Sequence, residues 1–342
     1  MRTQTRVAAG VPTGGQFANM LHAESNVALD EPTGESIVDK ESSFTKKYDT
    51  VDEKLKAIGE ELAAAVADLR FDDEWNKMLD VMSRFHHYSL SNQMLIAIQT
   101  GGRATRAAGF RKWQELGRQV KKGEKGITIL APKRVSKTEK DENGKPVIGA
   151  DGKPVRRSFI TGFTTATVFD ISQTEGDEIP DVDKMMELSE EPPSDFKKDL
   201  TDAIHREGFT VEYAAISGGT RGYTDPIDKK VVIRADLPPA NQTSTLAHEL
   251  GHIRMGHLDR MDEYRTGHSG KRPAMEIEAE SFAYALCRIN GQDPVGKSGR
   301  YVASWGDTNP EKVKESAEAV ANAVKETLAA DPWKNAAERT PA

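Results

Sequence analysis

The sequence predicts an α+β protein with two domains. The length of 342 residues exceeds what one ordinary hydrophobic core holds, so two domains with connecting segments are expected. Apolar residues recur at three- and four-residue steps over several long segments, which is the period of amphipathic helices. Short β-branched runs bounded by turn residues predict small antiparallel sheets between these helices.

In the first domain, helical patterns come before the strands. The first stripe runs from Leu55 to Leu69, and a second covers 73–99 and ends at a Gly-Gly pair. A third helical pattern covers 110–120. The run 127–130 predicts a short strand that Pro132 closes, and a second strand is expected over 159–169.

The sequence between these two strands predicts an exposed hairpin excursion over 138–157. Gly144-Lys145-Pro146-Val147 recurs there as Gly152-Lys153-Pro154-Val155, and both copies begin with a turn dipeptide. Further along, ten acidic residues face three lysines within 171–200, which predicts a solvated acidic linker. The expected organisation is therefore a flexible tail (1–45), a first domain (46–175), a linker (176–194), a second domain (195–330) and a short tail (331–342).

The second domain is expected to begin with a helix near 195, followed by strands over 210–213 and 230–234. Helices are then predicted over 240–256, 274–290 and 309–329. Gly291 stands directly after the second of these helices, where a C-terminal cap favours glycine.

Net charge and cysteine content limit the function. The chain has 47 basic and 54 acidic residues, a formal net charge of −7 that argues against nucleic-acid binding when taken whole. Its single cysteine, Cys287, excludes a disulfide framework and a cysteine-rich zinc module, and we expect a buried small residue there. No run is long enough for a membrane span, and the start lacks an apolar signal core. We therefore expect a cytoplasmic protein without a membrane partner.

One segment of the chain is strongly basic, although the whole chain is acidic. Residues 101–140 contain twelve basic and three acidic residues, a local net charge of +9 that can neutralise phosphates. Aromatic and amide side chains just upstream can stack on or hydrogen-bond to unpaired bases. The candidate DNA-binding residues are Tyr88, Asn92, Arg103, Arg106, Arg111, Lys112, Arg118, Lys121, Lys122 and Lys125. The alternative is a charge-rich solvated surface.

The motif His248-Glu249-Leu250-Gly251-His252 predicts a metal site. Residues four apart lie on one face of a helix, so both imidazoles can bind one ion. Glu249 is placed to deprotonate a metal-bound water. Gly251 lacks a Cβ, which permits another element to pass close to this helix.

Catalytic zinc normally takes three protein ligands, so a further ligand is required. The helix over 274–290 offers three glutamates, of which Glu276 and Glu280 share a face. We expect Glu280 to be the third ligand because small side chains flank it, with Glu278 and then Glu276 as alternatives. His257 is poorly placed to ligate the same ion and is expected at the surface or in support of the ligands. Zn²⁺ suits this donor set, although another divalent transition metal is an alternative.

Three segments of the first domain, 85–93, 109–126 and 168–174, and the motif 246–252 of the second carry a resemblance to a known family. They resemble the ArdC-type antirestriction proteins of mobile elements and phages, and the resemblance covers 46–330. It implies a single-stranded-DNA-binding domain joined to a zincin-like metallopeptidase domain, which also resembles ImmA/IrrE-type peptidases. By this resemblance His248, His252 and Glu280 are metal ligands and Glu249 is the catalytic base; the ImmA/IrrE comparison could place Glu278 at the third position instead.

The functional expectation is an antirestriction-type protein that binds single-stranded DNA and carries a gluzincin-like zinc metallopeptidase site. A protein substrate or a restriction component is an expected partner. Two alternatives remain open at this point. One is a regulator-cleaving metallopeptidase of the ImmA/IrrE type, and the other is a DNA-binding protection protein whose metal site is structural.

Overall fold

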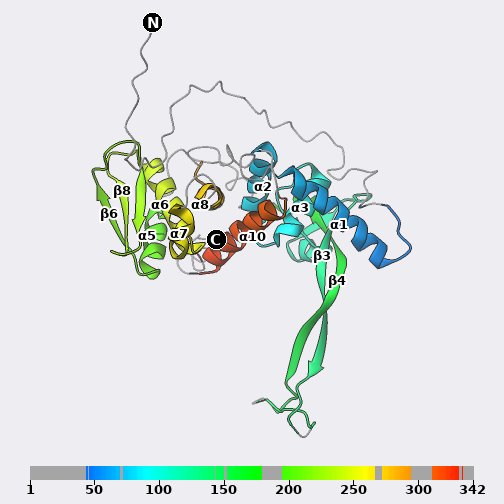
Figure 1. Ribbon diagram of the computed structural model, residues 1–342. Helices are drawn as coiled ribbons and strands as arrows, with labels where there is room; N and C mark the ends of the chain where they lie inside the picture. Colours follow the sequence, from blue (N-terminus) through cyan, green and yellow to red (C-terminus); the bar gives the residue numbers. More distant parts are fainter. Residues whose placement is uncertain are drawn as a thin grey trace.

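The structure is a computed structural model. It describes residues 44, 46–69, 72–142, 144–149, 152–178, 195–265, 272–293, 310–330 and 333. Nearly all of the predicted tails, at 1–45 and 331–342, and most of the predicted acidic linker, at 176–194, lie outside these residues. The remaining segments form an α+β structure with two groups of elements (Figure 1).

Three helices open the first group. Helix α1 spans Val51–Asp68, α2 spans Asp72–Arg84 and α3 spans Leu90–Thr100. The prediction of one continuous helix over 73–99 was therefore wrong. The chain turns after Arg84, and Ser89 begins α3 by accepting a hydrogen bond from the Asn92 amide through its side chain. The apolar period continues through this turn because both helices face the same core.

The third predicted helix is also shorter than expected. Helix α4 spans only Phe110–Glu115, and Gly117 has a left-handed backbone (φ 73°) that ends the helical path. The next residues form strand β2 (Arg118–Val120), which pairs antiparallel with β5 (Thr174–Gly176). The pairing partner lies more than fifty residues away, so local periodicity could not reveal it.

A three-stranded antiparallel sheet completes the first group. Its strand order is β1 (Ala107–Ala108), β4 (Arg156–Asp170), β3 (Ile127–Thr138), and a short 3-10 helix, η1 (Ile171–Gln173), follows β4. Pro132 does not close its strand as predicted, because β3 is an edge strand and an edge tolerates a missing backbone donor. The ends of β3 and β4 project far from the rest of the molecule as a two-stranded ribbon (Figure 1).

The second group begins with α5 (Phe196–Arg206) and a small mixed sheet. Strand β8 (Lys230–Arg234) lies in the centre, parallel to β6 (Thr210–Ala214) and antiparallel to β7 (Gly222–Asp225). The predicted strands over 210–213 and 230–234 correspond to β6 and β8, whereas no strand was predicted at the position of β7.

The helices of the second group match their predicted positions closely. Helix α6 spans Pro239–Arg254, α8 spans Arg272–Ile289 and α10 spans Pro310–Ala329; between the first two lie η2 (Leu258–Arg260) and α7 (Met261–Arg265). Gly291 has a left-handed backbone (φ 76°), which confirms the predicted cap. Although α10 is 20 residues long, neither it nor any other described helix combines the length and apolar character needed to cross a membrane.

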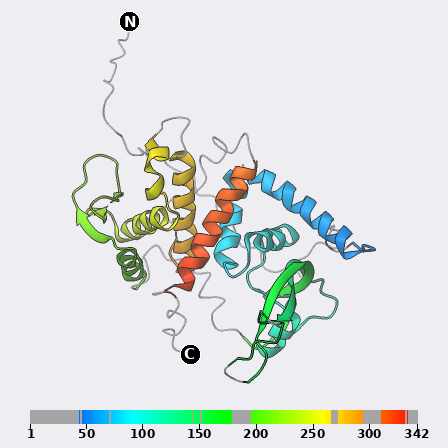
Figure 2. The same ribbon diagram turned by 60° about the horizontal axis from the view of Figure 1, so that its bottom comes forward.

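One hydrophobic core joins the two groups. It includes residues of α1, α2 and α3 together with residues of α5, α6, α8, α10 and β8. Trp75 of α2 is fully buried, and its Nε1 donates a 2.9 Å hydrogen bond to Ser281 Oγ on α8. Helix α10 contacts α8 as well as α1 and α3, and it lies between the two groups in Figure 2. The helices of the first group therefore support the helix that carries the three glutamates.

This shared core predicts that the two groups unfold together. Trp75→Ala removes a fully buried aromatic side chain, so we expect a loss of about 3–5 kcal/mol in the free energy of unfolding. Ser281→Ala is the matched control, because it removes only the hydrogen bond and should cost about 1–3 kcal/mol. Denaturant unfolding followed by fluorescence and circular dichroism measures both. Two separate transitions in the wild-type protein would contradict a shared core.

Candidate metal centre

Helix α6 brings the residues of the predicted motif together. His248 and His252 project from the same face, and their Nε2 atoms lie 3.0 Å apart. Leu246, Ala247 and Leu250 are fully buried on the opposite side and fix the rotation of the helix against the core. The side chain of His252 is only 10% exposed, so its Nε2 is held in a desolvated position.

Helix α8 passes very close to α6 at Gly251. A Cβ at this glycine would lie 3.1 Å from Phe282 Cδ1 and 3.2 Å from both Cα and O of Ala279. Two of these three atoms belong to the backbone of α8, so a side chain here would push the helices apart. The predicted reason for glycine at this position, the close passage of another element, is confirmed.

This approach places a carboxylate of α8 at the two histidines. Glu276 Oε2 lies 3.5 Å from His248 Nε2 and 3.9 Å from His252 Nε2, and the three residues form a group able to hold a metal ion. Two donors bound tetrahedrally at about 2.1 Å from one ion lie about 3.4 Å apart. The three observed spacings, of 3.0, 3.5 and 3.9 Å, surround this value. The donor set therefore fits a divalent metal ion.

The structure places the other two glutamates differently from Glu276. Glu280, the expected ligand, lies one turn further along α8, with its Oε2 3.3 Å from Nδ1 of His248 and thus on the far side of the ring. Glu278 turns away from the imidazoles of α6, as its position on the helix predicted, and contacts His257. Glu276, ranked last from the sequence, is the carboxylate that the structure brings to both Nε2 atoms.

A chain of buried contacts holds the ring of His252 from behind. Its Nδ1 lies 2.9 Å from Nδ1 of His257, and Nε2 of His257 lies 2.9 Å from Glu278 Oε2. His257 is 1% exposed, so it takes the supporting role, one of the two that were expected, and is not a surface residue. Ser316 of α10 donates to the other oxygen of Glu278. No sequence pattern indicated Ser316, since it stands 38 residues from its partner.

Glu249 lies beside the histidines and is oriented by a residue that sequence reasoning missed. Its Oε2 accepts a 2.7 Å hydrogen bond from Thr224 Oγ1 on β7. Burial raises the pKa of Glu249 above that of an ordinary glutamate. A carboxylate with a raised pKa is suited to accept and return a proton.

The pKa values of the two histidines are shifted in opposite directions. Burial and the neighbouring His248 lower the pKa of His252 to about 3, so this ring is neutral and ready to ligate. Burial also acts against the charged form of His248, but the carboxylates of Glu276 and Glu280 outweigh it and raise its pKa well above the usual value. A metal ion at this site must therefore displace a proton from His248.

The predicted DNA-binding residues have different surroundings. Asn92 is buried and pairs with both the backbone N–H and the carbonyl of Leu130, at 2.8 and 2.9 Å, so it fixes α3 to β3. Tyr88 donates to the Ala107 carbonyl, and Arg118 binds Thr174 and the β5 backbone. Exposed positions are those of Arg103, Arg111, Lys112, Lys121 and Lys122, whereas Arg106 and Lys125 are half-buried.

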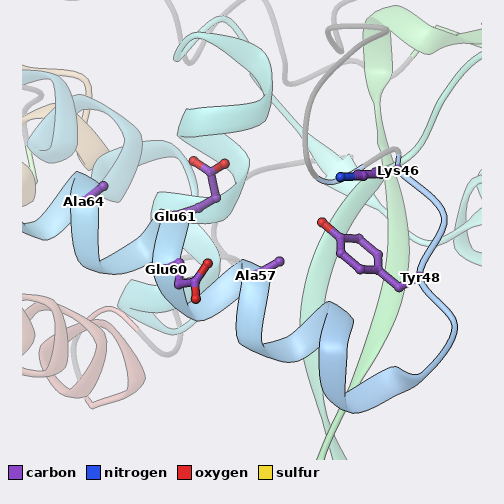
Figure 3. Close-up of a pocket in the computed structure, with 6 residues that line it drawn as sticks. All are labelled: Lys46, Tyr48, Ala57, Glu60, Glu61 and Ala64. Carbon is purple, nitrogen blue, oxygen red and sulfur yellow. The ribbon is translucent and has the colours of Figure 1, made fainter.

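Two other features lie apart from this centre. Cys287 is fully buried, and burial raises the pKa of its thiol to about 12, which agrees with the expected inert residue. A surface hollow lies between α1 and the segment before it (Figure 3), and none of the predicted site residues lines it. Its lining residues are Lys46, Tyr48, Ala57, Glu60, Glu61 and Ala64.

Comparison with known proteins finds a match in each half of the chain. Residues 45–169 match the N-terminal domain of anti-restriction factor ArdC, and residues 206–289 match the IrrE N-terminal-like domain of the M78 peptidases. The chain is similar to the antirestriction protein ArdC from plasmid R388. The metal-free structure of that protein shows 24% identity, covers 71% of this chain and 85% of its own, and has a TM-score of 0.42. Its Mn(II)-bound structure shows 24% identity with 71% and 86% coverage and a TM-score of 0.40. No curated protein matches.

The fold and the His-Glu-x-x-His centre define an α+β protein with a metallopeptidase-like second half. The two matched domains, and their order along the chain, describe this protein more closely. The chain carries an ArdC-type N-terminal domain followed by an IrrE-like domain.

Proton displacement from His248 predicts that metal binding strengthens as pH rises. Because the pKa of His248 is raised, the ring still holds a proton near neutral pH, and each pH unit below that pKa should weaken binding roughly tenfold. Calorimetric titration with Zn²⁺ between about pH 6 and pH 8 measures this dependence. Repeating it in two buffers of different ionisation enthalpy detects the released proton. An affinity that is constant over this range, with no proton released, would contradict the assignment.

Proposed function

We propose that this protein binds single-stranded DNA through its first half and carries a zinc metallopeptidase-like site in its second half, and that it protects incoming mobile-element DNA from host restriction. The observation that carries the proposal is the convergence of His248, His252 and Glu276, with Glu249 beside them, in a chain of ArdC domain order. Glu280 of the same helix was the ligand expected from the sequence.

The proposed ligands are His248, His252 and Glu276. Two imidazole nitrogens and one carboxylate oxygen form the donor set of many catalytic zinc sites and leave a further position on the ion for water or substrate. The same donors accept manganese, the ion in one solved structure of ArdC from plasmid R388. Glu280 then acts on Nδ1 of His248 and holds that ring in place, in the manner of a supporting carboxylate.

When bound, a divalent ion at this site would act as a Lewis acid that polarises a carbonyl and acidifies water. Glu249 acts as the general base. Thr224 fixes one carboxylate oxygen of Glu249 at 2.7 Å, which leaves the other oxygen to accept a proton and later return it to the leaving amine. His257 and Glu278 keep the His252 ring oriented throughout, because both contacts measure 2.9 Å and the side chains of His257 and Glu278 are only 1% and 13% exposed.

DNA binding rests on the match to the ArdC N-terminal domain and on the basic surface of the first half. Arg103, Arg111, Lys112, Lys121 and Lys122 expose their side chains, and they can contact phosphates. Tyr88, Asn92 and Arg118 instead make contacts within the protein, so their substitution would disturb the fold before it disturbed DNA binding.

Glu249→Gln tests whether the chemistry of the site serves protection. The amide keeps the size of the side chain but cannot accept the proton, so we expect peptide cleavage to fall by about 10²–10⁴. Protection of unmodified DNA entering a restricting host should be lost, while metal content and DNA binding stay unchanged. His252→Ala is the companion variant, which should lose the metal as well. Full protection by Glu249→Gln would contradict a peptidase role in antirestriction.

A further inference from the structure

The ribbon formed by the outer parts of β3 and β4 has no packing partner among the described residues. From Pro132 on β3 and back to Phe163 on β4, nearly every side chain is exposed, whereas the inner ends of both strands are buried in the sheet. Figure 1 shows the ribbon extending well beyond the body of the molecule. We call 132–138 together with 156–163 the arm. None of the ten DNA-binding residues predicted from the sequence lies on it.

The arm carries only positive charge. Its two strands contain Lys133, Arg134, Lys137, Arg156 and Arg157, and no aspartate or glutamate. Arg157 forms an exposed ion pair with Glu139 near the tip, at 2.8 Å. Within the described part of the chain, the other four basic side chains have no acidic partner. Such a surface repels a second copy of itself and attracts a polyanion.

Large apolar side chains stand among these charges. Phe159 is 49% exposed, Phe163 is 57% exposed and Ile160 is 55% exposed. A ribbon with free edges and exposed aromatic residues tends to aggregate. A ribbon that only had to stay in solvent would carry polar side chains at these positions. The arrangement instead suits a ligand that has both charge and flat apolar surface.

The register of the strands places both kinds of side chain on each face of the arm. On one face Phe159 lies opposite Val135. Two residues further along the arm, Lys137 lies opposite Arg157 on the same face. On the other face Phe163 lies opposite Pro132 and Ile160 opposite Arg134. Each face therefore offers one aromatic ring with cations within a few residues of it.

We infer that the arm is a binding surface for single-stranded nucleic acid. Its cations contact phosphates, and the rings of Phe159 and Phe163 stack on unpaired bases, the two interactions that together define single-strand binding. A duplex keeps its bases stacked and offers no partner to an exposed ring on the ribbon surface. A neutral membrane or an apolar protein partner would suit the apolar side chains but not the five basic residues among them. An anionic membrane would suit both, and vesicle binding distinguishes it from single-stranded nucleic acid. The inference rests on the proposed function and deepens it.

Two variants of the full-length protein test the two contributions separately. Lys133→Gln/Arg134→Gln/Lys137→Gln/Arg156→Gln should bind a fluorescein-labelled oligothymidylate about tenfold or more weakly in an anisotropy titration. Its salt dependence should be shallower by about 0.7 in logarithmic slope for each phosphate that the variant no longer neutralises. Phe159→Ala/Phe163→Ala should bind about fivefold or more weakly for each ring removed, with the slope unchanged.

Matched controls guard against general effects of charge and of size. Lys198→Gln/Arg206→Gln/Lys312→Gln/Lys325→Gln removes the same number of charges from exposed positions on α5 and α10, and it should bind as the wild type does. Phe159→Leu/Phe163→Leu keeps apolar bulk without an aromatic face and should behave as the alanine pair. Since all substituted side chains are exposed, thermal unfolding should be the same for every variant.

The outcomes separate this inference from the proposed function. A wild-type protein that does not bind the oligonucleotide would overturn both. A wild-type protein that binds, with arm variants of equal affinity and salt slope, would overturn the arm alone. Stronger wild-type binding to a duplex, with the phenylalanine variants unaffected, would also overturn it. So would arm variants that lose binding only to phosphatidylserine vesicles, tested in parallel.

Discussion

The close approach of α6 and α8 is the constraint on which the metal centre depends. Gly251 stands one residue before His252 on α6. The backbone of Ala279 and the ring of Phe282, both on α8, occupy the space next to Gly251 that a Cβ would need. The separation of the helices sets the reach of the carboxylates. At this distance Glu276 reaches both Nε2 atoms, and Glu280 reaches the opposite side of the His248 ring. A side chain at position 251 would push α8 away and would move both glutamates relative to the histidines.

Helix α8 also links the centre to the rest of the molecule. One of its faces meets α2, where Ser281 bonds to Trp75 and where Tyr284 donates a 2.7 Å hydrogen bond to Asp80. Arg288 extends this contact with a 3.2 Å ion pair to the same aspartate. On another side Glu278 connects His257 to Ser316 of α10. The helix that supplies the metal carboxylate is thus held by elements from both matched domains.

Much of this organisation could be predicted because it follows from local spacing. The positions of α5, α6, α8 and α10, the pairing of His248 with His252 and the role of Gly251 all follow from helical period and residue type. The break at Ser89 and the strand after Gly117 could not be read in this way. There, a cap and a distant strand partner overrode an apolar pattern that continued on both sides.

The identity of the third metal ligand could not be predicted from the sequence. Glu276 and Glu280 are equivalent by helical phase, so the choice between them depends on how far α8 is displaced along α6. That displacement is set by tertiary packing at Gly251 and Trp75, which no local pattern reveals. Thr224 was missed for a related reason, since its strand β7 is short and becomes a strand only by pairing with β8.

A crystal structure of the protein with zinc or manganese, with the ion located by anomalous diffraction at its absorption edge, tests the metal centre most directly. We expect one ion bonded to Nε2 of His248, Nε2 of His252 and a carboxylate oxygen of Glu276, with Glu280 against Nδ1 of His248. An ion bonded to Glu280 or Glu278 in place of Glu276, or to His257, would contradict this assignment.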